Sequence, residues 1–518
     1  MNKDSLQIII SMCSYLILVI GIGLYYAKRA NESSKNYFIG GRTLGPWITA
    51  LSAEASDMSG WLLMGLPGVA YFYGLSDAIW TAIGLSVGTY ICWLYLAKRL
   101  RNYSHVAGDS ITIPDYLSNR FKENKKVIMT IAALFILIFF TVYASSCFVT
   151  VGKLFSTLFG LNYQLMMIAG ALFVLFYTVL GGFLAESASD FLQALVMIFA
   201  LVAAFIVSFV TAGGIKPVLD NIREIPGFFE FFGIAQPTLK DGVQEVVNGK
   251  PLFGSAGKYG FLTVISTLSW GLGYFGMPHF LIRFMAIRDA EEIKKSRRIA
   301  IIWCVISLMA AVGIGLIGRA LYPAELLTQS TAERIFVVIS CNLLPPLFAG
   351  IVMAGILAAT ISSSDSYLLI ATSAISKNLF QGVIKKDATD RQVMLVSRII
   401  LLLIAVVGII IALDENSVIF KVVSFAWAGF GATFGPIMIL SLFWKRTTQA
   451  GAIAGMISGG VMVFVWNLLL KPLGGVFGIY ELLPAFVISC IVIVIVSLLS
   501  GEPSREIQEE FEKVKAMK

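Results

Sequence analysis

Two carboxyl groups, those of Glu54 and Asp57, lie in an otherwise apolar stretch from Ala50 to Gly68 that also holds three serines and three glycines. A charged side chain at the middle of a membrane is costly, so such groups normally face a cavity and mark the path of an ion or a substrate. Glycine and serine weaken helical hydrogen bonding, and backbone carbonyl groups freed at this depth are tolerated only where they line a cavity. The stretch therefore predicts a broken helix beside a cavity, with oxygen atoms that suit a cation.

A second group of oxygen atoms comes from hydroxyl side chains in the apolar segment from Gly355 to Leu369. Ser362 and Ser363 follow Ala359 by three and four residues, so all three share one face of a helix. These hydroxyl groups could simply bond to their own backbone, as serine does in helices. Alternatively, they join the free carbonyl groups of the first stretch in a cage of oxygen ligands, which suits a hard cation. A neutral cage favours Na⁺, because Na⁺ is easier to dehydrate than a divalent ion.

The segment from Ser266 to Phe280 has the composition of another broken helix, interrupted by Gly271, Gly273, Gly276 and Pro278. Proline has no backbone N–H, so the carbonyl group four residues before it is left free. Helices interrupted by glycine and proline at corresponding positions of two halves indicate an inverted-repeat secondary transporter, with its site at the midplane between them.

The elements that must position these residues are membrane-spanning helices. Of the 518 residues, 58% are hydrophobic and 14% are charged, with a mean hydropathy of +0.84, whereas a soluble protein carries about a quarter charged residues. Apolar runs of about 20 residues recur without the period-two alternation of a β-barrel. The sequence predicts an all-α polytopic membrane protein with 13 transmembrane helices, at 6–27, 44–72, 76–98, 127–156, 162–182, 190–212, 259–285, 299–319, 334–375, 396–413, 417–443, 449–470 and 478–500.

Lysine and arginine are distributed unevenly between the two sides of this arrangement. The segments on one side hold 28 of the 39 basic residues, and those on the other side hold 9. The positive-inside rule therefore predicts an N-terminus outside and a C-terminus in the cytoplasm, which agrees with an odd number of spans. The net charge of +8 follows from this distribution, so we expect no nucleic-acid partner.

We expect a single transmembrane transporter domain over residues 1–501. Two five-helix sets follow one another, and an odd number of helices places successive copies in opposite orientations. The first repeat is predicted at about 43–212 and the second at about 258–444, with extra helices at 6–27, 449–470 and 478–500. For the cytoplasmic tail, 502–518, a solvated segment is the favoured interpretation, and a short amphipathic surface helix is the alternative.

Several kinds of active site are excluded by the absence of their motifs. The sequence has no G-x-x-x-x-G-K-[ST] phosphate loop, which argues against an ATP-driven motor in this chain. Its only histidines are His105 and His279, which lie too far apart in sequence for an H-E-x-x-H zinc site. We therefore expect a transporter and not an enzyme.

Five stretches of the sequence resemble the sodium/solute symporter family, and within it the bacterial members that transport proline. They are GGRTLGPWITALSAEASDMSGWLLMGLPG (40–68), WGLGYFGMPH (270–279), ILAATISSSDS (356–366), SFAWAGFGATFGP (424–436) and WKRTTQAGAIAGM (444–456). The resemblance covers nearly the whole chain in order. It implies a LeuT-type 5+5 inverted-repeat core with broken helices in spans 2 and 7. It also implies secondary active transport by alternating access, in which inward Na⁺ flow drives L-proline uptake.

The same resemblance implies a place in the cell and a set of partners. The chain would be a multi-pass protein of the bacterial cytoplasmic membrane, with Na⁺ as its coupling ion. Its partners would be L-proline, Na⁺ and the lipid bilayer, and no obligate protein partner is expected.

Roles for single residues also follow from the resemblance. The implied Na⁺ ligands are backbone carbonyl groups and hydroxyl groups, those of Ala55, Met58, Ala359, Ser362 and Ser363. Further residues are implied in coupling and the ion path: Asp57 as an essential carboxylate, Arg42 in inner-gate opening, and Asp190 on the inward sodium exit path.

The implied L-proline pocket consists of Ser59, Tyr143, Trp270, Tyr274 and Pro278. Trp270 and Tyr274 are four residues apart and share a helical face, so their rings can pack the pyrrolidine while their N–H and O–H groups bond polar atoms. The alternative for any one aromatic residue here is a place in the protein core or in the belt at the membrane interface.

Two residues depart from the family pattern. Glu54 stands where some relatives have glycine, and an extra buried acid could be neutral, pair with a base or alter the choice of ion. Met277 stands where some relatives have glutamine, and loss of that amide could shift affinity or substrate range.

Two other functions remain open. One is Na⁺-coupled symport of another small amino acid or carboxylate. The other is a transporter-like membrane sensor, which is disfavoured because such sensors append a signalling domain, whereas this chain ends about 18 residues after its last predicted span.

Overall fold

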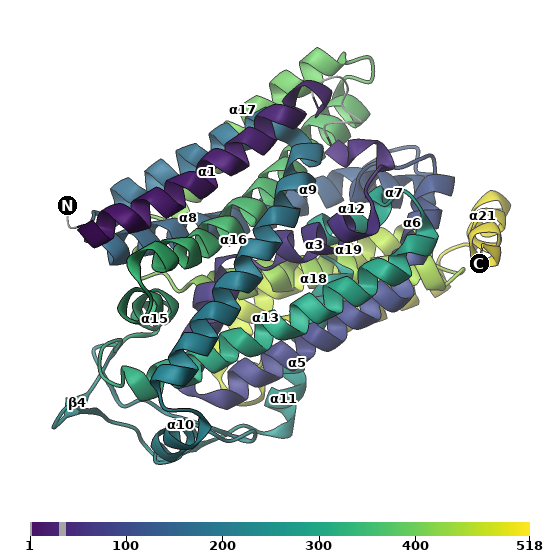
Figure 1. Ribbon diagram of the computed structural model, residues 1–518. Coiled ribbons are helices and arrows are strands. Elements are labelled where there is room, and N and C mark those ends of the chain that lie inside the picture. Colours follow the sequence, from purple (N-terminus) through teal and green to yellow (C-terminus); the bar gives the residue numbers. More distant parts are fainter. Residues whose placement is uncertain (1–2, 31–37, 518) are drawn as a thin grey trace.

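The computed structural model describes residues 3–30 and 38–517, and within these the chain is helical over most of its length (Figure 1). Residues 31–37, part of the loop predicted on the cytoplasmic side, lie outside the described residues. The α-helices are α1 (Lys3–Ala30), α3 (Pro46–Asp57), α4 (Leu66–Tyr73), α5 (Leu75–Ile91), α6 (Ala97–Val106), α7 (Ile113–Arg120), α8 (Val127–Phe159), α9 (Tyr163–Thr211), α10 (Ile215–Ile222), α11 (Phe261–Leu268), α12 (Pro278–Ala286), α13 (Ile293–Leu321), α14 (Gln329–Ala332), α15 (Ile335–Leu343), α16 (Pro346–Ser373), α17 (Asp390–Ile411), α18 (Ile419–Phe443), α19 (Gln449–Val465), α20 (Leu482–Leu499) and α21 (Arg505–Ala516).

Short 3-10 and π-helical turns extend or join these helices. They are η1 (Gly40–Arg42), η2 (Trp61–Gly65), η3 (Cys92–Leu96), η4 (Ser269–Phe275), η5 (Ala290–Glu292), η6 (Ala374–Ile384), η7 (Trp466–Leu470), η8 (Lys471–Leu473) and η9 (Gly475–Gly478).

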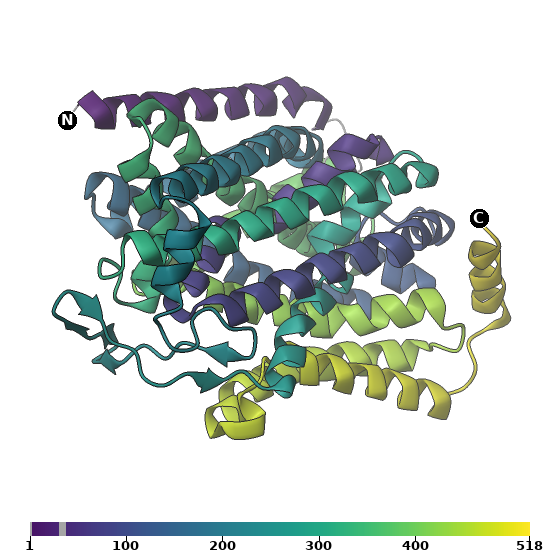
Figure 2. The same cartoon turned by 60° about the horizontal axis from the view of Figure 1, so that its bottom comes forward.

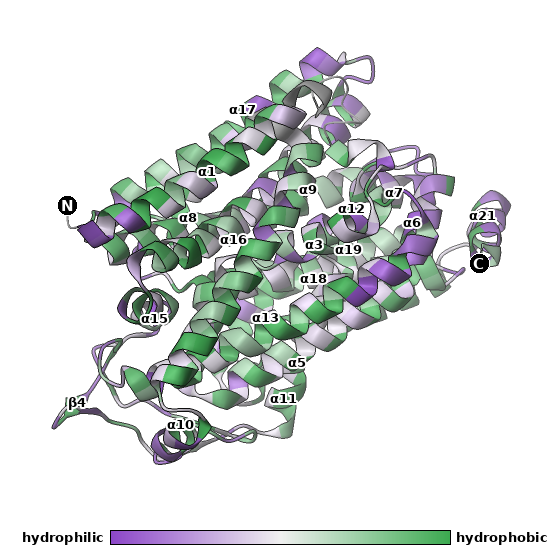
Figure 3. Ribbon diagram, in the orientation of Figure 1, coloured by the Kyte–Doolittle hydropathy of each residue, from purple (hydrophilic) through white to green (hydrophobic). Residues whose placement is uncertain are grey.

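Apolar helices account for every predicted span. Within the described residues, ten helices are long and apolar enough to cross a membrane, and three shorter apolar helices lie at Trp61–Tyr73, Tyr163–Val179 and Phe261–Phe275. The shorter three overlap with parts of the spans predicted at 44–72, 162–182 and 259–285. The all-α polytopic fold is confirmed, and hydrophobic residues predominate in the long helices (Figure 3). The count of thirteen crossings and the two five-helix repeats stay predictions.

The two predicted helix breaks are present. α3 ends at Asp57, and Met58 has non-helical angles, φ −86° and ψ 80°, before the chain turns back into a helix at η2. α11 gives way to the 3-10 turn η4, after which α12 begins with Pro278 in its first turn, where the missing proline N–H does no harm. Each break therefore lies where the glycine, serine and proline pattern predicts it.

The second break lies close against α18, which only glycine permits. A Cβ atom at Gly273 would come within 2.0 Å of Trp427 Nε1, and one at Gly276 within 2.3 Å of the Phe430 carbonyl oxygen. These glycines therefore have two effects. They weaken the helix, and they let its backbone pack directly against α18.

Helix α16 forms the centre of the molecule. Every residue from Val352 to Ser373 is buried, and the helix packs most extensively against α9, α8 and α1. Because these residues are buried, the hydroxyl groups of α16 face protein and not lipid. Helix α9 spans the two predicted segments 162–182 and 190–212 with a bend at Gly182, where φ is 55°.

The two ends of the helix bundle carry different structures. At one end lie α10 and six short strands, which pair antiparallel as three two-stranded sheets, β1–β6, β2–β3 and β4–β5 (Figures 1 and 2). The strands are β1 (Gly233–Ile234), β2 (Leu239–Lys240), β3 (Val243–Gln244), β4 (Val246–Val247), β5 (Lys250–Pro251) and β6 (Gly257–Lys258). At the opposite end lie α6, α7 and α21.

The C-terminal segment is a helix, α21, that packs against α6. Its buried residues are Ile507, Phe511 and Val514, which recur at the spacing of one helical face. The interpretation of the tail as a solvated segment is therefore wrong, and the alternative, an amphipathic helix, is confirmed.

Candidate functional site

The break after α3 releases two backbone carbonyl groups from the helix. In an unbroken helix each N–H donates to the carbonyl four residues earlier. Here the Ser59 N–H donates to the Asp57 carbonyl at 3.0 Å instead of to Ala55, and the Leu62 N–H donates to Ser59 at 3.0 Å instead of to Met58. The carbonyl groups of Ala55 and Met58, two of the predicted Na⁺ ligands, are thereby freed from their helical donors.

Hydroxyl groups of α16 meet the first of these carbonyl groups. Ser362 Oγ donates to the Ala55 carbonyl at 2.7 Å and lies 3.2 Å from the Ala359 carbonyl, and Ser363 Oγ lies 3.3 Å from the same Ala55 oxygen. Four of the five predicted ligands therefore converge between α3 and α16, and Met58 stands at the break itself, fully buried. The neighbouring Ser364 bonds back to its own helix at the Thr360 carbonyl, as serine commonly does.

The chemistry of this oxygen set fits a monovalent hard cation. All of its members are neutral oxygen atoms, and the residues that bear them are buried. A serine hydroxyl that donates to a carbonyl can rotate and turn a lone pair toward a cation that binds between the two. When a cation binds, these oxygen atoms would therefore give up hydrogen bonds to one another and contact the cation instead. No charged side chain would be needed.

Asp57 connects the two broken helices. Its Oδ2 accepts a hydrogen bond from the Tyr274 hydroxyl at 2.9 Å, and its Oδ1 lies 3.4 Å from His279 Nε2. Asp57 and His279 are both fully buried. The sequence did not predict the proximity of His279 to Asp57, because the two residues are far apart along the chain and belong to different helices.

Aromatic residues surround the first break, together with the residues predicted for the L-proline pocket. The Asp57 carbonyl lies 3.1 Å from Trp61 Nε1 and 3.5 Å from the hydroxyl groups of both Tyr143 and Tyr367. The rings of Tyr143 and Tyr367 stack with centroids 4.2 Å apart. Ser59 Oγ is buried and has no hydrogen-bond partner among the described residues, so it is available to a ligand.

The other predicted pocket residues come from the second break. Trp270 stacks near Trp61, with centroids 6.4 Å apart, and packs against Phe420 and Tyr480 at 5.1 Å each. Tyr274 lies one turn further on and reaches Asp57, while Pro278 starts α12. The structure thus brings Ser59, Tyr143 and Tyr274 together around Asp57. Trp270 joins them through Trp61.

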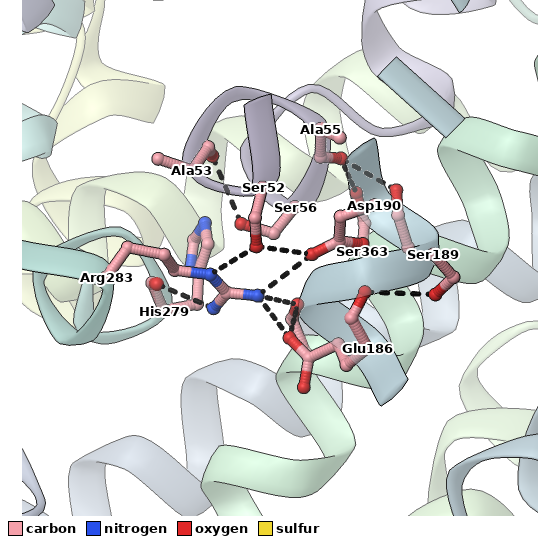
Figure 4. Close-up of polar contacts among 12 residues, drawn as sticks. Ser52, Ala53, Ala55, Ser56, Glu186, Ser189, Asp190, His279, Arg283 and Ser363 are labelled. Carbon is pink, nitrogen blue, oxygen red and sulfur yellow. Dashed lines mark hydrogen bonds and ion pairs between the residues drawn. The ribbon is translucent and has the colours of Figure 1, made fainter. Parts of the chain in front are cut away.

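Asp190, predicted on the inward exit path, belongs to a buried ionic network (Figure 4). Its Oδ2 accepts from Ser52 Oγ at 2.7 Å and lies 3.2 Å from Arg283 Nη2. Arg283 also forms an ion pair with Glu186, and it donates to Ser52 Oγ at 3.1 Å and to the His279 carbonyl at 2.7 Å. The network joins α3, α9 and α12, and sequence reasoning missed its central residue, Arg283.

Arg42 ties the start of span 2 to the polar end of the bundle that carries α6 and α7. Its Nε donates to Asp109 at 2.9 Å, its Nη1 donates to Ser104 Oγ at 3.3 Å and to the Met285 carbonyl, and its Nη2 donates to the Ser110 carbonyl at 2.6 Å. Burial lowers the pKa of Arg42, and the adjacent Asp109 carboxylate opposes that shift. Arg42 thus fastens η1 to α6, to the loop before α7, and to the end of α12.

Glu54 and Met277, the two residues predicted to depart from the family pattern, are both buried. Glu54 Oε1 accepts from Trp93 Nε1 at 3.4 Å, and its Oε2 has no hydrogen-bond partner within the described part of the chain. Trp93 in turn packs edge-on against Phe284, with centroids 4.5 Å apart. Met277 is fully buried and precedes α12 as its cap residue.

The comparisons with known proteins agree among themselves. Residues 37–459 match the profile of the sodium:solute symporter family. The chain is 40% identical over 516 residues to a protein named "Sodium/proline symporter" from Staphylococcus aureus (strain USA300 / TCH1516), and the match covers 98% of this chain and 96% of that protein. The same identity and coverage hold for the protein of that name from Staphylococcus aureus (strain COL).

Two solved structures share the fold. A Na⁺-coupled sialic acid symporter in a substrate-bound outward-open state superimposes with a TM-score of 0.76 at 17% identity, over 96% of this chain and 99% of that one. Mhp1, a nucleobase-cation-symport-1 family transporter, superimposes with a TM-score of 0.54 at 13% identity, over 92% of this chain and 98% of that one. At such identities the likeness concerns the fold alone.

Proposed function

The chain belongs to the sodium:solute symporter family, and from that premise we propose that it couples the inward flow of Na⁺ to the uptake of L-proline by alternating access. Membership of this family means that the chain is a Na⁺-coupled membrane transporter and not an enzyme. L-proline as the substrate is proposed from the 40% identity to proteins named sodium/proline symporter.

The observation that supports the proposal best is the meeting of α3 and α16 at the Ala55 carbonyl. In the proposed site, Na⁺ binds among the carbonyl groups of Ala55, Met58 and Ala359 and the hydroxyl groups of Ser362 and Ser363. Because these groups come from two helices, a bound cation would draw the helices together. It would also order the break that carries Asp57 and Ser59.

The proposed L-proline pocket adjoins this break. The pyrrolidine would pack against Trp270, Tyr143 and Tyr274, and the carboxylate would take hydrogen bonds from the Ser59 hydroxyl and from N–H groups at the break. Pro278 would keep the second break open beside it. Since Tyr274 already bonds Asp57, ordering of one break is transmitted to the other.

Release toward the cytoplasm would require the contacts of Arg42 with α6 and the adjoining loop to open, and Na⁺ would leave past Asp190. Coupling between two ligands is reciprocal, so Na⁺ should tighten L-proline binding by the same factor as L-proline tightens Na⁺ binding. Each Na⁺ that moves inward at 100 mV supplies roughly 2.3 kcal/mol, which corresponds to about 50-fold accumulation of solute.

We place the protein in the cytoplasmic membrane with its N-terminus outside and its C-terminus in the cytoplasm. The support is the excess of basic residues at the end that carries α6 and α7. The two broken helices at corresponding positions, α3–α4 and α11–α12, support the inverted-repeat arrangement of about 43–212 and about 258–444.

The proposal is tested by uptake of labelled L-proline into proteoliposomes with an inward Na⁺ gradient, compared with an equal K⁺ gradient. We expect uptake only with Na⁺ and competition by unlabelled L-proline. Saturating uptake of a different amino acid, with no effect of L-proline, would favour the alternative substrate. Equal uptake in Na⁺ and K⁺ would rule out Na⁺ coupling.

A further inference from the structure

The C-terminal helix α21 is docked on the polar end of the bundle, beside α6 (Figure 1). It begins with the Ser504 hydroxyl as its cap, which accepts from the Ile507 N–H at 3.4 Å. Its apolar face is buried against the body, with Phe511 4% exposed and Val514 2% exposed. A helix that only covered the surface loosely would leave this face in solvent.

The surface beneath α21 is aromatic and basic. The centroid of the Phe511 ring lies 4.9 Å from the guanidinium carbon of Arg99 and 5.6 Å from that of Arg120, and the ring lies edge-on to Tyr103 at 6.4 Å. Such cation–π contacts strengthen where water is excluded. Phe511 is therefore the anchor of the docked helix.

Ion pairs join acidic residues of α21 to basic residues of the body. Lys122 Nζ lies 2.5 Å from Glu510 and 3.4 Å from Glu506, and Lys445 Nζ lies 3.4 Å from Glu512. The side chains of Lys122 and Lys445 are 34% and 47% exposed, so these pairs weaken as salt screens them. The docking thus combines a salt-insensitive apolar anchor with salt-sensitive ion pairs.

Helix α21 and Arg42 contact the same segment of the chain. We call residues 97–120, which comprise α6 and α7, the inner cover. One face of the cover meets Arg42 through Ser104, Asp109 and the Ser110 carbonyl. Another face presents Arg99, Tyr103 and Arg120 to Phe511. The inner cover therefore carries two sets of contacts. One set joins it to Arg42 and has to open for release to the cytoplasm, and the other joins it to α21.

We propose that α21 is a strap that holds the inner cover closed, and that its release, favoured by rising ionic strength, speeds opening of the inner path. The inference rests on the proposed transport function for its rate readout, but the docking itself is measurable without transport. With the strap docked, the cover has to move together with α21. With the strap released, the cover is still restrained by the Arg42 contacts, by the neighbouring helices and by the hydrogen bond from Arg101 to the Ile287 carbonyl.

The central experiment compares Phe511→Ala with the matched control Glu509→Ala, in proteoliposomes at low ionic strength. Glu509 lies on the same helix, is mostly exposed and, among the described residues, pairs with Arg505 one turn away, so its removal leaves the docked face intact. Hydrogen exchange of residues 505–516 reports docking, exchange of 97–120 reports the cover, and initial Na⁺-driven L-proline uptake reports transport. We expect faster exchange in both segments and about two- to tenfold faster uptake for Phe511→Ala, and wild-type behaviour for Glu509→Ala.

The ionic-strength dependence separates a strap from a merely structural helix. Raising K⁺ salt equally on both sides, at a constant Na⁺ gradient, should bring wild-type uptake toward the rate of Phe511→Ala and leave that variant nearly unchanged. Lys122→Glu and Glu510→Lys should each loosen α21, and the double variant should restore its protection by reversing the pair.

The outcomes distinguish the two proposals. If the wild type shows no Na⁺-driven L-proline uptake, the proposed function fails, while the exchange data still decide whether α21 restrains the cover. If Phe511→Ala releases α21 but leaves the exchange of 97–120 and the uptake rate as in the wild type, the strap is refuted. If Phe511→Ala does not fold, the same criteria apply to Lys122→Glu.

Discussion

Ser362 and Ser363 direct their hydroxyl groups at one carbonyl oxygen of another helix, that of Ala55, whereas Ser364 turns back to its own helix. This difference makes a sharp test of the proposed Na⁺ site. Ser362→Ala should raise the Na⁺ concentration for half-maximal uptake by roughly tenfold or more, since hydrogen-bonding groups that contact a charge are the strong ones. Ser364→Ala is the matched control and should leave that concentration unchanged; a large effect at Ser364 alone would contradict the assignment.

Asp57 is the carboxyl group that joins the two broken helices, through Tyr274 and beside His279. Asp57→Asn keeps the shape but removes the charge, so we expect Na⁺-driven uptake to fall below about a tenth of the wild-type rate while the protein still reaches the membrane. Uptake assays and immunoblots of membranes measure the two quantities. Wild-type uptake in this variant would remove Asp57 from the mechanism.

Glu54, three residues away, should behave differently. Its carboxyl group receives one hydrogen bond, from Trp93 at 3.4 Å, and its other oxygen has no partner among the described residues. An uncharged amide of the same shape suits such a site, because a buried charge without a partner is costly. We expect Glu54→Gln to transport within about threefold of the wild type, measured in the same uptake assay as Asp57→Asn. A complete loss would show that Glu54 needs its acid group.

At the scale of elements, the second break depends on close contact between its glycines and α18. A Cβ atom at Gly276 would come within 2.3 Å of the Phe430 carbonyl oxygen, whereas one at Gly260, at the start of α11, would meet nothing within 4 Å. Gly276→Ala should therefore destabilise the protein by about 1–3 kcal/mol, as overpacking does, and Gly260→Ala should not. Thermal melting in detergent checks the pair, and equal melting temperatures would contradict the packing argument.

For the molecule as a whole, the unequal distribution of basic residues predicts an orientation in the membrane. A fluorescent protein fused after Lys518 should fold and fluoresce, since it would stay in the cytoplasm. Alkaline phosphatase inserted at Gly249, in the turn between β4 and β5, should be active, since it would lie outside. The reverse pattern of reporter activities would overturn the proposed orientation.

The all-α membrane fold, the positions of both helix breaks and the hydroxyl pair of α16 could be predicted from the amino-acid sequence. This is possible because polar groups, glycine and proline within apolar spans are local signals that a lipid-facing helix rarely carries. The roles of Ala55 and Met58 as ligands were instead implied by the family resemblance, because a backbone carbonyl has no side-chain signature.

The contacts between groups that are distant in sequence are evident only in the folded protein. The partners of Asp57, the ionic network of Arg283, the donor to Glu54 and the docking of α21 all join residues that are far apart along the chain. No local pattern predicts such pairs, because they depend on how the helices pack. For the same reason the polar composition of the tail favours a solvated segment, while its three buried side chains find a matching surface only in the folded protein.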